Sequence, residues 1–337
     1  MSTDYGYINA RVRGMKTQLL APEFFSEALE ATDFRAFLSV LGQSRYMRDL
    51  EEAQARYQGL RAVDDALARD FFRITRSLLS SSDGTPGQLM ELLLLRYDRE
   101  NIKTIARAKH AGKEVEEILG SLFPAGPLKP AVLEEVAAAP DMAAAAQALM
   151  VTRTPLKTDF AKAAVRYQSD GDLYALELAI DRAYYRVLMQ RVRRANAPTS
   201  FVRHIVREID ATNLRTALKL RGSTASTEEL FIPGGREIDR SLFEGLRGDD
   251  SRTALQSLAG TTFAEVAETE SLAQAEQHVR AILDASARSA SSDPLGPGVV
   301  VRYLRLKEAE VARLRLLARG TFYQVPREAL RKELGHG

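Results

Sequence analysis

The chain has 337 residues, of which 45% are hydrophobic, so it is long enough for two or three domains with buried cores. It contains no cysteine, which excludes disulfides, thiol catalysis and cysteine-ligated metal sites and fits a reducing, cytoplasmic setting. The formal net charge of +2 is too balanced to indicate a nucleic-acid-binding protein. Hydrophobic residues recur with the helical period of 3.6, and no useful length of strand-like alternation occurs, which predicts an all-α fold.

The first predicted elements are an amphipathic helix over residues 4–20 and a short helix that starts at Pro22. A further short helix follows Asp33, whose carboxylate can accept free amide hydrogens at the N-cap. Similar short-helix segments return about 108 residues later, from Pro130, and about 109 residues after that. The matching residues are Asp33, Leu41 and Ser44, then Asp141, Leu149 and Thr152, then Asp250, Leu258 and Thr261.

Two long helices are predicted after each group of short ones. The 24 residues 86–109 would form a helix of about 36 Å. Because the connections between paired long helices are short, each pair should form an antiparallel hairpin. The predicted pairs are 65–81 with 86–109, 172–195 with 198–221, and 271–290 with 298–320.

Residues 86–109 return without a gap as residues 198–221, at a constant spacing of 112 from Pro86 to Pro198. An interior Asn costs a helix a few tenths of a kcal/mol relative to Ala. We therefore predict that the repeated Asn, with an Asp three residues earlier on the same face, fastens each helix to a neighbouring loop. The matched pairs are Asp98 with Asp210, Asn101 with Asn213, Thr104 with Thr216, Lys103 with Arg215, Arg107 with Lys219, and Lys109 with Arg221.

These repeats divide the chain into three copies of one helical domain, residues 1–111, 112–222 and 223–337. Loop-like segments rich in Pro and Gly occupy corresponding places at residues 123–127 and 231–235. The third copy is the most divergent, because Glu310 and Arg313 stand where the first two copies have Asp and Asn.

The usual catalytic motifs are missing. Gly112-Lys113 lacks the upstream glycine of a phosphate-binding loop, and Asp64-Asp65 and Asp249-Asp250 lack the final acid of a metal-diphosphate motif. We interpret both acidic pairs as helix N-caps and first-turn acids. The four histidines are isolated in sequence, without the spacing of a helical zinc site: His110, His204, His278 and His336. No apolar run approaches the roughly 20 residues of a membrane helix, and the start lacks a signal peptide, so we expect a soluble protein.

Three features together resemble the C subunit of rotary V/A-type ATPases, called the d subunit in eukaryotes. They are the Asp-x-x-Asn segments at 98–104 and 210–216, the opening YINARVR at 7–13, and FIPGG at 231–235. The resemblance covers essentially the whole chain. It implies a non-catalytic funnel of three pseudo-threefold-related helical domains with a central cavity.

The same resemblance implies the partners and the location. One copy would sit in each complex, on the cytoplasmic face of the membrane. It would link the axle of subunits D and F to the proteolipid rotor ring and transmit torque for proton or sodium transport coupled to ATP synthesis or hydrolysis. No catalytic residue, cofactor, metal or directly bound nucleotide is implied, and no nucleic acid.

Basic residues near the ends of the long helices are the candidate partner-binding residues, because they should line up around the pseudo-threefold axis and could pair with acidic axle or ring residues. They could equally complement the helix dipoles alone. The candidates are Arg107, Lys109, Lys219, Arg221 and Arg319. A second basic group, Arg186, Arg191, Arg193 and Arg194, ends another long helix, either as a solvated face or as a site for an acidic protein.

Two other classes of function stay open at this stage. The chain could be a free-standing helical scaffold that binds other proteins, which co-purification with a rotor ring and axle would exclude. It could also be an all-helical enzyme, which activity of the isolated chain on nucleotides or diphosphates would support.

Overall fold

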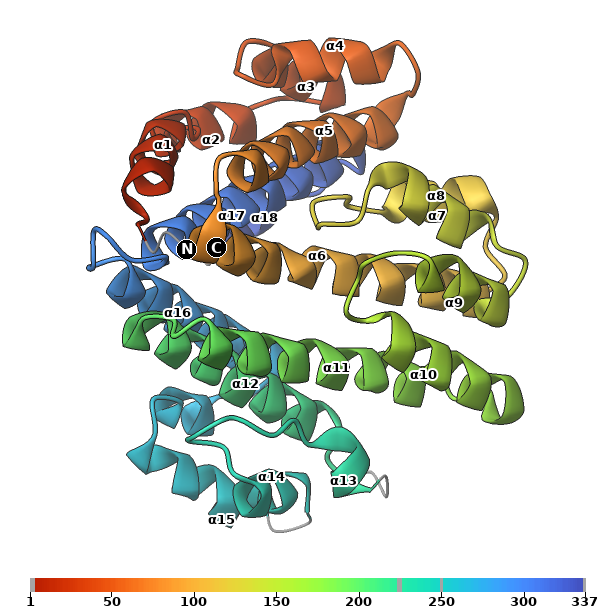
Figure 1. Ribbon diagram of the computed structural model, residues 1–337. Coiled ribbons are helices and arrows are strands. Elements are labelled where there is room, and N and C mark those ends of the chain that lie inside the picture. Colours follow the sequence, from red (N-terminus) through yellow and green to blue (C-terminus); the bar gives the residue numbers. More distant parts are fainter. Residues whose placement is uncertain (1–3, 223–225, 249–250, 336–337) are drawn as a thin grey trace.

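A computed structural model describes residues 4–222, 226–248 and 251–335 (Figure 1). Within these ranges the regular secondary structure consists of helices, with no strand, which confirms the predicted all-α class. The helices of the first copy are α1 (Gly6–Lys16), α2 (Pro22–Leu29), α3 (Phe34–Gly42), α4 (Met47–Gln54), α5 (Gly59–Ser80) and α6 (Gly84–His110).

The later helices follow the same order of short elements and then long ones. The second set is α7 (Val115–Ser121), α8 (Pro130–Ala138), α9 (Met142–Met150), α10 (Lys157–Asp170), α11 (Leu173–Arg194) and α12 (Thr199–Lys219). The third set is α13 (Thr227–Leu230), α14 (Arg240–Arg247), α15 (Ser251–Gln256), 3₁₀ turns at Ser257–Gly260 and Ala264–Glu268, α16 (Leu272–Ala290), α17 (Gly298–Phe322) and α18 (Arg327–Gly335).

The short helices begin and end as the sequence repeat predicts. Asp33 and Asp141 each accept a hydrogen bond of 2.8 Å from the amide three residues on, so both are N-caps; Asp250 lies outside the described residues. The hydroxyls at the matching exits donate to the carbonyl three residues earlier. These bonds run from Ser44 to Leu41 (2.6 Å), from Thr152 to Leu149 (2.7 Å) and from Thr261 to Leu258 (2.8 Å).

Asp64 and Asp65 are not N-caps, so our interpretation of this pair was wrong. Helix α5 begins at Gly59, which has a positive φ of 60°, and the two acids lie in its second turn. The sequence feature that marks the true helix start is Gly59, because glycine adopts positive φ without a steric penalty. Asp249 and Asp250 lie outside the described residues.

The six long helices form a closed cycle of contacts. In order around the cycle these are α5, α6, α11, α12, α16 and α17, and α17 packs back on α5. In the first two copies, the two helices of each predicted hairpin make little contact with one another. Helix α6 packs mainly on α11, and α12 packs mainly on α16, so each of these helices packs chiefly against a long helix of the next copy.

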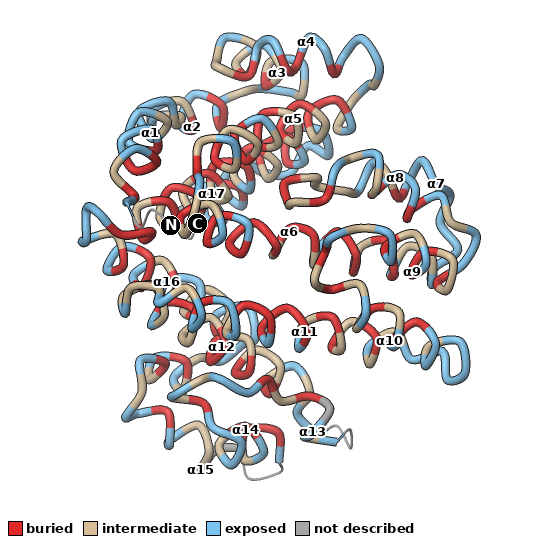
Figure 2. Tube along the Cα trace, viewed as in Figure 1, coloured by how far each residue is buried: buried red, intermediate tan, exposed pale blue. Residues whose placement is uncertain are grey.

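Burial follows the long helices. Figure 2 shows α6 buried along most of its length, whereas the outer short helices alternate buried and exposed residues. Leu89 and Leu92 to Leu95 are buried and Glu91 is exposed, as the nearly all-round apolar sequence of this segment predicts. None of the helices in the described ranges combines the length and apolarity needed to cross a bilayer.

Candidate functional site

The Asp–Asn pair of α6 holds the loop that precedes α8. The Asn101 amide donates to the Phe123 carbonyl and accepts from the Phe123 amide, both at 2.8 Å. The Asp98 carboxylate accepts the Leu128 amide at 3.1 and 3.2 Å. Gly126 lies so close to Asp98 that a Cβ there would overlap the carboxylate. The predicted fastening of this helix to a loop is confirmed.

Helix α12 repeats the arrangement with the loop that precedes α14. Asn213 exchanges the same two bonds with Ile232, at 2.8 and 2.9 Å. Asp210 accepts three successive amides, those of residues 236 to 238, at 2.9 to 3.2 Å. Gly235 occupies the place of Gly126, where a Cβ would overlap the Asp210 carboxylate. We call the contacts of Asp98 with Asn101, and of Asp210 with Asn213, the amide clamps.

Burial raises the pKa of both clamp carboxyls. The Asp98 pKa rises to about 8, because desolvation disfavours the carboxylate more than the Leu128 amide and Arg76 favour it. The Asp210 pKa is also raised by burial, against the opposing effect of its three amide donors. Asp210 accepts three backbone amides whereas Asp98 accepts one, so hydrogen bonding favours the carboxylate form more strongly at Asp210.

Helix α17 contacts the first copy through charged side chains rather than through an Asp–Asn pair. Glu310 accepts the Leu20 amide and the Tyr46 hydroxyl, each at 2.6 Å, and pairs with Lys307 at 2.6 Å. The Lys307 ammonium also lies 2.7 Å from Asp70, and both side chains are fully buried. We call the group formed by Tyr46, Asp70, Lys307 and Glu310 the ionic joint.

Asp70 stays ionised in the ionic joint. Burial alone would raise its pKa, but Lys307, Arg45 and Arg73 outweigh desolvation and hold the pKa below its usual value. Arg313, which replaces the clamp Asn, lies with its guanidinium 5.6 Å from the centre of the Phe25 ring. The divergence of the third copy therefore changes the chemistry of the contact but keeps its place, at the chain segment that precedes the next short helices.

A second repeated contact joins neighbouring long helices by ion pairs. Basic residues five and nine positions after the clamp acid, or after Glu310 in the third copy, reach an acid on the adjacent helix. The pairs are Lys103 with Asp181 (2.7 Å), Arg107 with Glu177 (2.6 Å), Arg215 and Lys219 with Glu276 (3.0 and 2.9 Å), and Arg315 and Arg319 with Asp64 (2.9 and 3.1 Å).

The five candidate partner-binding residues thus fall into three environments. Arg107, Lys219 and Arg319 have ion-pair partners in the chain, although each side chain stays about half exposed. Lys109 donates to the Ala137 and Ala139 carbonyls. Arg221 is exposed and pairs with no described residue.

A charged cavity of about 420 Å³ lies between α6, α11, α12, α16 and α17. The Arg96 guanidinium, in the lining, lies 3.6 Å from Glu208, also in the lining, and 3.5 Å from Glu308, which is outside the lining. Arg96 and His204 outweigh the desolvation of Glu208 and lower its pKa. The other charged residues of the lining are Arg99, Glu100, Lys103, Asp181, Arg215, Lys219, Glu276 and Arg305.

Arg96, Glu208 and Glu308 occupy the same position in the three copies, two residues before the clamp acid or Glu310. Three residues at one position of the sequence repeat are therefore brought together here. Our sequence reasoning missed this trio, although the alignment of residues 86–109 with 198–221 already pairs an Arg with a Glu here.

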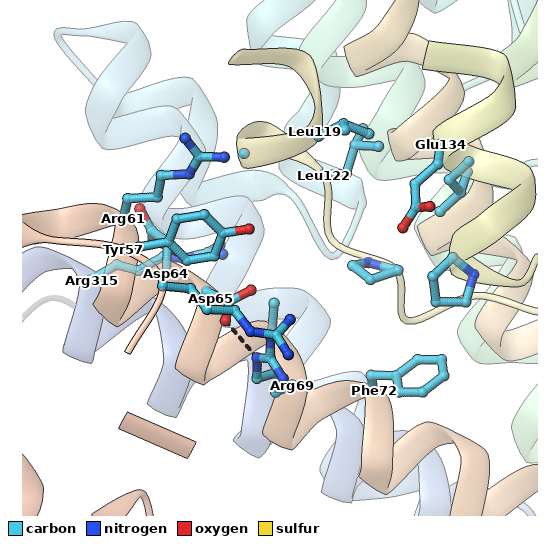
Figure 3. Close-up of a pocket in the computed structure, with 16 residues that line it drawn as sticks. Tyr57, Arg61, Asp64, Asp65, Arg69, Phe72, Leu119, Leu122, Glu134 and Arg315 are labelled. Carbon is cyan, nitrogen blue, oxygen red and sulfur yellow. Dashed lines mark hydrogen bonds and ion pairs between the residues drawn. The ribbon is translucent and has the colours of Figure 1, made fainter. Parts of the chain in front are cut away.

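A second hollow of about 420 Å³ lies between α5 and the segment 119–134 (Figure 3). Several of its charged side chains have partners within the chain. Arg69 pairs with Asp65 at 2.5 Å, and the Arg61 guanidinium lies 4.2 Å from the centre of the Tyr57 ring. Among the described residues no group of three His, Asp or Glu side chains is placed to hold a metal ion. This hollow therefore lies where α5 packs against the loop that Asn101 holds.

Comparison with known proteins gives one consistent result. Residues 8–333 match the family described as ATP synthase (C/AC39) subunit. The chain is 37% identical to the C subunit of the V-type ATP synthase of Deinococcus radiodurans, over 99% of this chain and 92% of the relative. It is 34% identical to the V-type C subunit of Thermus thermophilus and 27% identical to the A-type C subunit of Archaeoglobus fulgidus, covering 99% and 98% of this chain and 99% and 96% of those relatives.

Proposed function

Because the chain belongs to the ATP synthase (C/AC39) subunit family, we propose that it is the central-stalk rotor subunit of a V/A-type ATP synthase. It is a non-catalytic subunit of that complex. As a socket, it receives the axle formed by subunits D and F, stands on the proteolipid rotor ring, and transmits torque between them. One copy serves each complex, at the cytoplasmic face of the membrane.

The observation that carries this proposal is the closed cycle of six long helices, five of which line a charged cavity. A torque coupler must resist bending, and close-packed helices joined by side-chain contacts deform less than loops. The amide clamps, the ionic joint and the ion pairs fasten the long helices to neighbouring segments of the chain. Ten charged side chains line the cavity and offer a polar surface to the foot of an axle.

We further propose that residues 1–111, 112–222 and 223–337 are the duplicated domains and that they form a pseudo-threefold funnel. The meeting of Arg96, Glu208 and Glu308 supports an axis through this region. Arg107, Lys109, Lys219, Arg221 and Arg319 lie at corresponding ends of the long helices and are the proposed contacts with acidic residues of the axle.

Deleting the protein from the complex tests this function. ATP hydrolysis by the soluble head should continue, whereas ATP-driven ion pumping into sealed vesicles should stop, since the axle and the ring are no longer connected. Persistent pumping would contradict the coupling role. If the chain does not co-purify with ring and axle, it acts instead as a free-standing scaffold.

A further inference from the structure

The charged cavity is lined by more basic than acidic side chains. Six bases and four acids line it, which leaves an excess of two positive charges in the lining. The bases come from three helices, so they surround the cavity from several sides. A cleft whose walls carry one sign of charge attracts ions of the opposite sign. The bases are Arg96, Arg99 and Lys103 of α6, Arg215 and Lys219 of α12, and Arg305 of α17.

Four of these bases are almost buried. The side chains of Arg96, Arg99, Lys103 and Arg305 are only 11–16% exposed. The Arg99 guanidinium also packs against a tyrosine, 4.5 Å from the centre of the Tyr184 ring. Charges that have little contact with water interact more strongly than charges at an open surface. An anion inside the cavity would therefore feel these bases with little screening.

The pKa values of the lining acids indicate a positive potential. Burial alone would raise the pKa of Glu100, Glu208 and Glu276. Neighbouring bases outweigh this desolvation and hold each of the three pKa values below its usual value. The three acids lie on α6, α12 and α16, so the bases favour negative charge at three separate places on the wall.

The ion pairs of the lining do not exhaust its arginines. The Arg96 guanidinium lies 3.6 Å from Glu208, and that of Arg99 lies 3.5 Å from Asp181. Both distances are longer than those of a normal hydrogen bond. Because a guanidinium has five N–H donors, such long contacts leave it able to bind a further acceptor.

Acids outside the lining do not cancel the excess charge inside it. Glu308 pairs with Arg96, and Asp284 pairs with Arg305. The side chains of these two acids are 29% and 43% exposed, so water and salt screen them. The bases that they pair with are better shielded from solvent than the acids are.

The chemistry of the wall matches that of a phosphate group. Phosphate groups carry about −1.5 to −2 charges at neutral pH, close to the excess of two positive charges here. Guanidinium groups bind phosphate oxygens through two parallel hydrogen bonds. Hydroxyls of Thr212, Thr216 and Tyr185 also line the cavity, and the Tyr185 hydroxyl lies 2.8 Å from that of Thr212. Hydroxyls can donate to the remaining oxygens of the anion.

We propose that the charged cavity binds a phosphate-type dianion, held by Arg99 of α6, Arg215 of α12 and Arg305 of α17. Free phosphate and the terminal phosphates of a nucleotide share this chemistry. Under the proposed function the foot of the axle enters the same cavity, so the anion and the axle compete for it. This competition rests on the proposed function, whereas the anion site itself does not.

The test is equilibrium dialysis of the full chain against radiolabelled inorganic phosphate at constant ionic strength. The unaltered chain should bind one phosphate saturably. The variant Arg215→Gln, Arg305→Gln should bind it at least about tenfold more weakly, as expected when two charged donors are lost. The matched control, Arg35→Gln, Lys162→Gln, loses the same net charge at exposed sites and should bind phosphate normally.

A variant of opposite sign separates charge from damage to the fold. Glu276→Gln removes a negative charge from the wall, so it should bind phosphate at least about threefold more tightly than the unaltered chain. If Glu276→Gln and the arginine variant both weaken binding, the proposal is overturned, because a disturbed wall explains both losses. Equal losses in the arginine variant and the exposed control would overturn it too, since the attraction would then be non-specific.

Two further arms identify the anion and test the link to the axle. ADP that displaces labelled phosphate at lower concentration than unlabelled phosphate does would support the site and show that its ligand is a nucleotide. Saturating phosphate should weaken binding of the axle of subunits D and F. If phosphate binds but axle affinity is unchanged, the placing of the axle in this cavity fails and the anion site stands. If no phosphate binds, the anion site fails whatever the axle does.

Discussion

The amide clamps on α6 and α12 and the ionic joint on α17 do the same task with different chemistry. The amide clamps hold loops that lie near in sequence, since Asn101 and Phe123 are 22 residues apart. The ionic joint connects Glu310 to Leu20 across 290 residues. Closing the longer loop costs about 2 kcal/mol more chain entropy. The comparison teaches that the contact which closes the ring of helices is the one built from buried charges.

Buried charges make that contact specific. A buried ion pair gains little net stability, because desolvation offsets most of the attraction, but a lone buried charge is costly. Lys307 therefore fits only where Asp70 and Glu310 meet it. The amide clamps need no such match, since every loop offers backbone amides and carbonyls.

The largest expected effect comes from removing the cation of the ionic joint. Lys307→Met leaves the buried Glu310 without its ion-pair partner and Asp70 with only Arg45 and Arg73, which should lower the free energy of unfolding by about 3–5 kcal/mol. Urea unfolding followed by circular dichroism measures it. Lys162→Met, at an exposed site, should change stability by less than about 0.5 kcal/mol. A similar small loss for both variants would show that the joint is not structurally important.

Breaking an amide clamp should cost less. Asn213→Ala leaves the amide and carbonyl of Ile232 unpaired in a buried site, so we expect a loss of about 2–4 kcal/mol in urea unfolding. Asn213→Asp can still accept from the Ile232 amide but cannot donate to the carbonyl, and it buries a carboxylate three residues from Asp210, so it should lose at least as much stability as Asn213→Ala. Equal stability of Asn213→Ala and the unaltered chain would contradict the clamp.

The two kinds of contact should respond to pH in opposite directions. The Asp98 pKa is raised from 3.8 to about 8, so its stabilising effect is full below pH 4 and is lost as the pH rises through 8. This group contributes a slope of up to about 1.4 kcal/mol per pH unit between those values. Asp98→Asn should remove that slope from the unfolding free energy measured at pH 5, 6 and 7.

Asp70 provides the contrasting case. Its pKa is lowered, so its stabilising effect is present above its unfolded-state pKa and is lost as the pH falls through the folded-state value. The acid side of the stability profile should therefore be unchanged in Asp98→Asn. If Asp98→Asn instead weakened the pH dependence of the unfolding free energy at acid pH and left the slope between pH 5 and 7 unchanged, the roles assigned to Asp98 and Asp70 would be reversed.

The smallest effect is expected for the ion pairs between long helices. Glu276→Gln removes the partner of Arg215 and Lys219 at a partly exposed site, and should cost about 0.5–1 kcal/mol. The loss should shrink in high salt, because solvent ions screen these charges. A loss above about 2 kcal/mol that does not depend on salt would show that packing, not charge, is affected.

Local patterns in the sequence predicted the helices and the clamps. Periodicity gave the all-α class, Asp33 and Asp141 gave their caps, and the costly interior Asn101 and Asn213 pointed to a loop contact. Each of these depends on residues within a few turns or on a polar group that must be satisfied wherever it is buried. Such signals can be seen in the sequence without knowledge of the packing.

Tertiary structure alone decided which helices pack together. Helix α6 pairs with α11 rather than chiefly with its hairpin partner α5, and Arg107, Lys219 and Arg319 find acids on neighbouring long helices. The sequence determined that the chain is helical, repeated and fastened by Asp and Asn. It could not determine that Arg96, Glu208 and Glu308 meet, because ion pairing depends on distances between segments that only the packed helices fix.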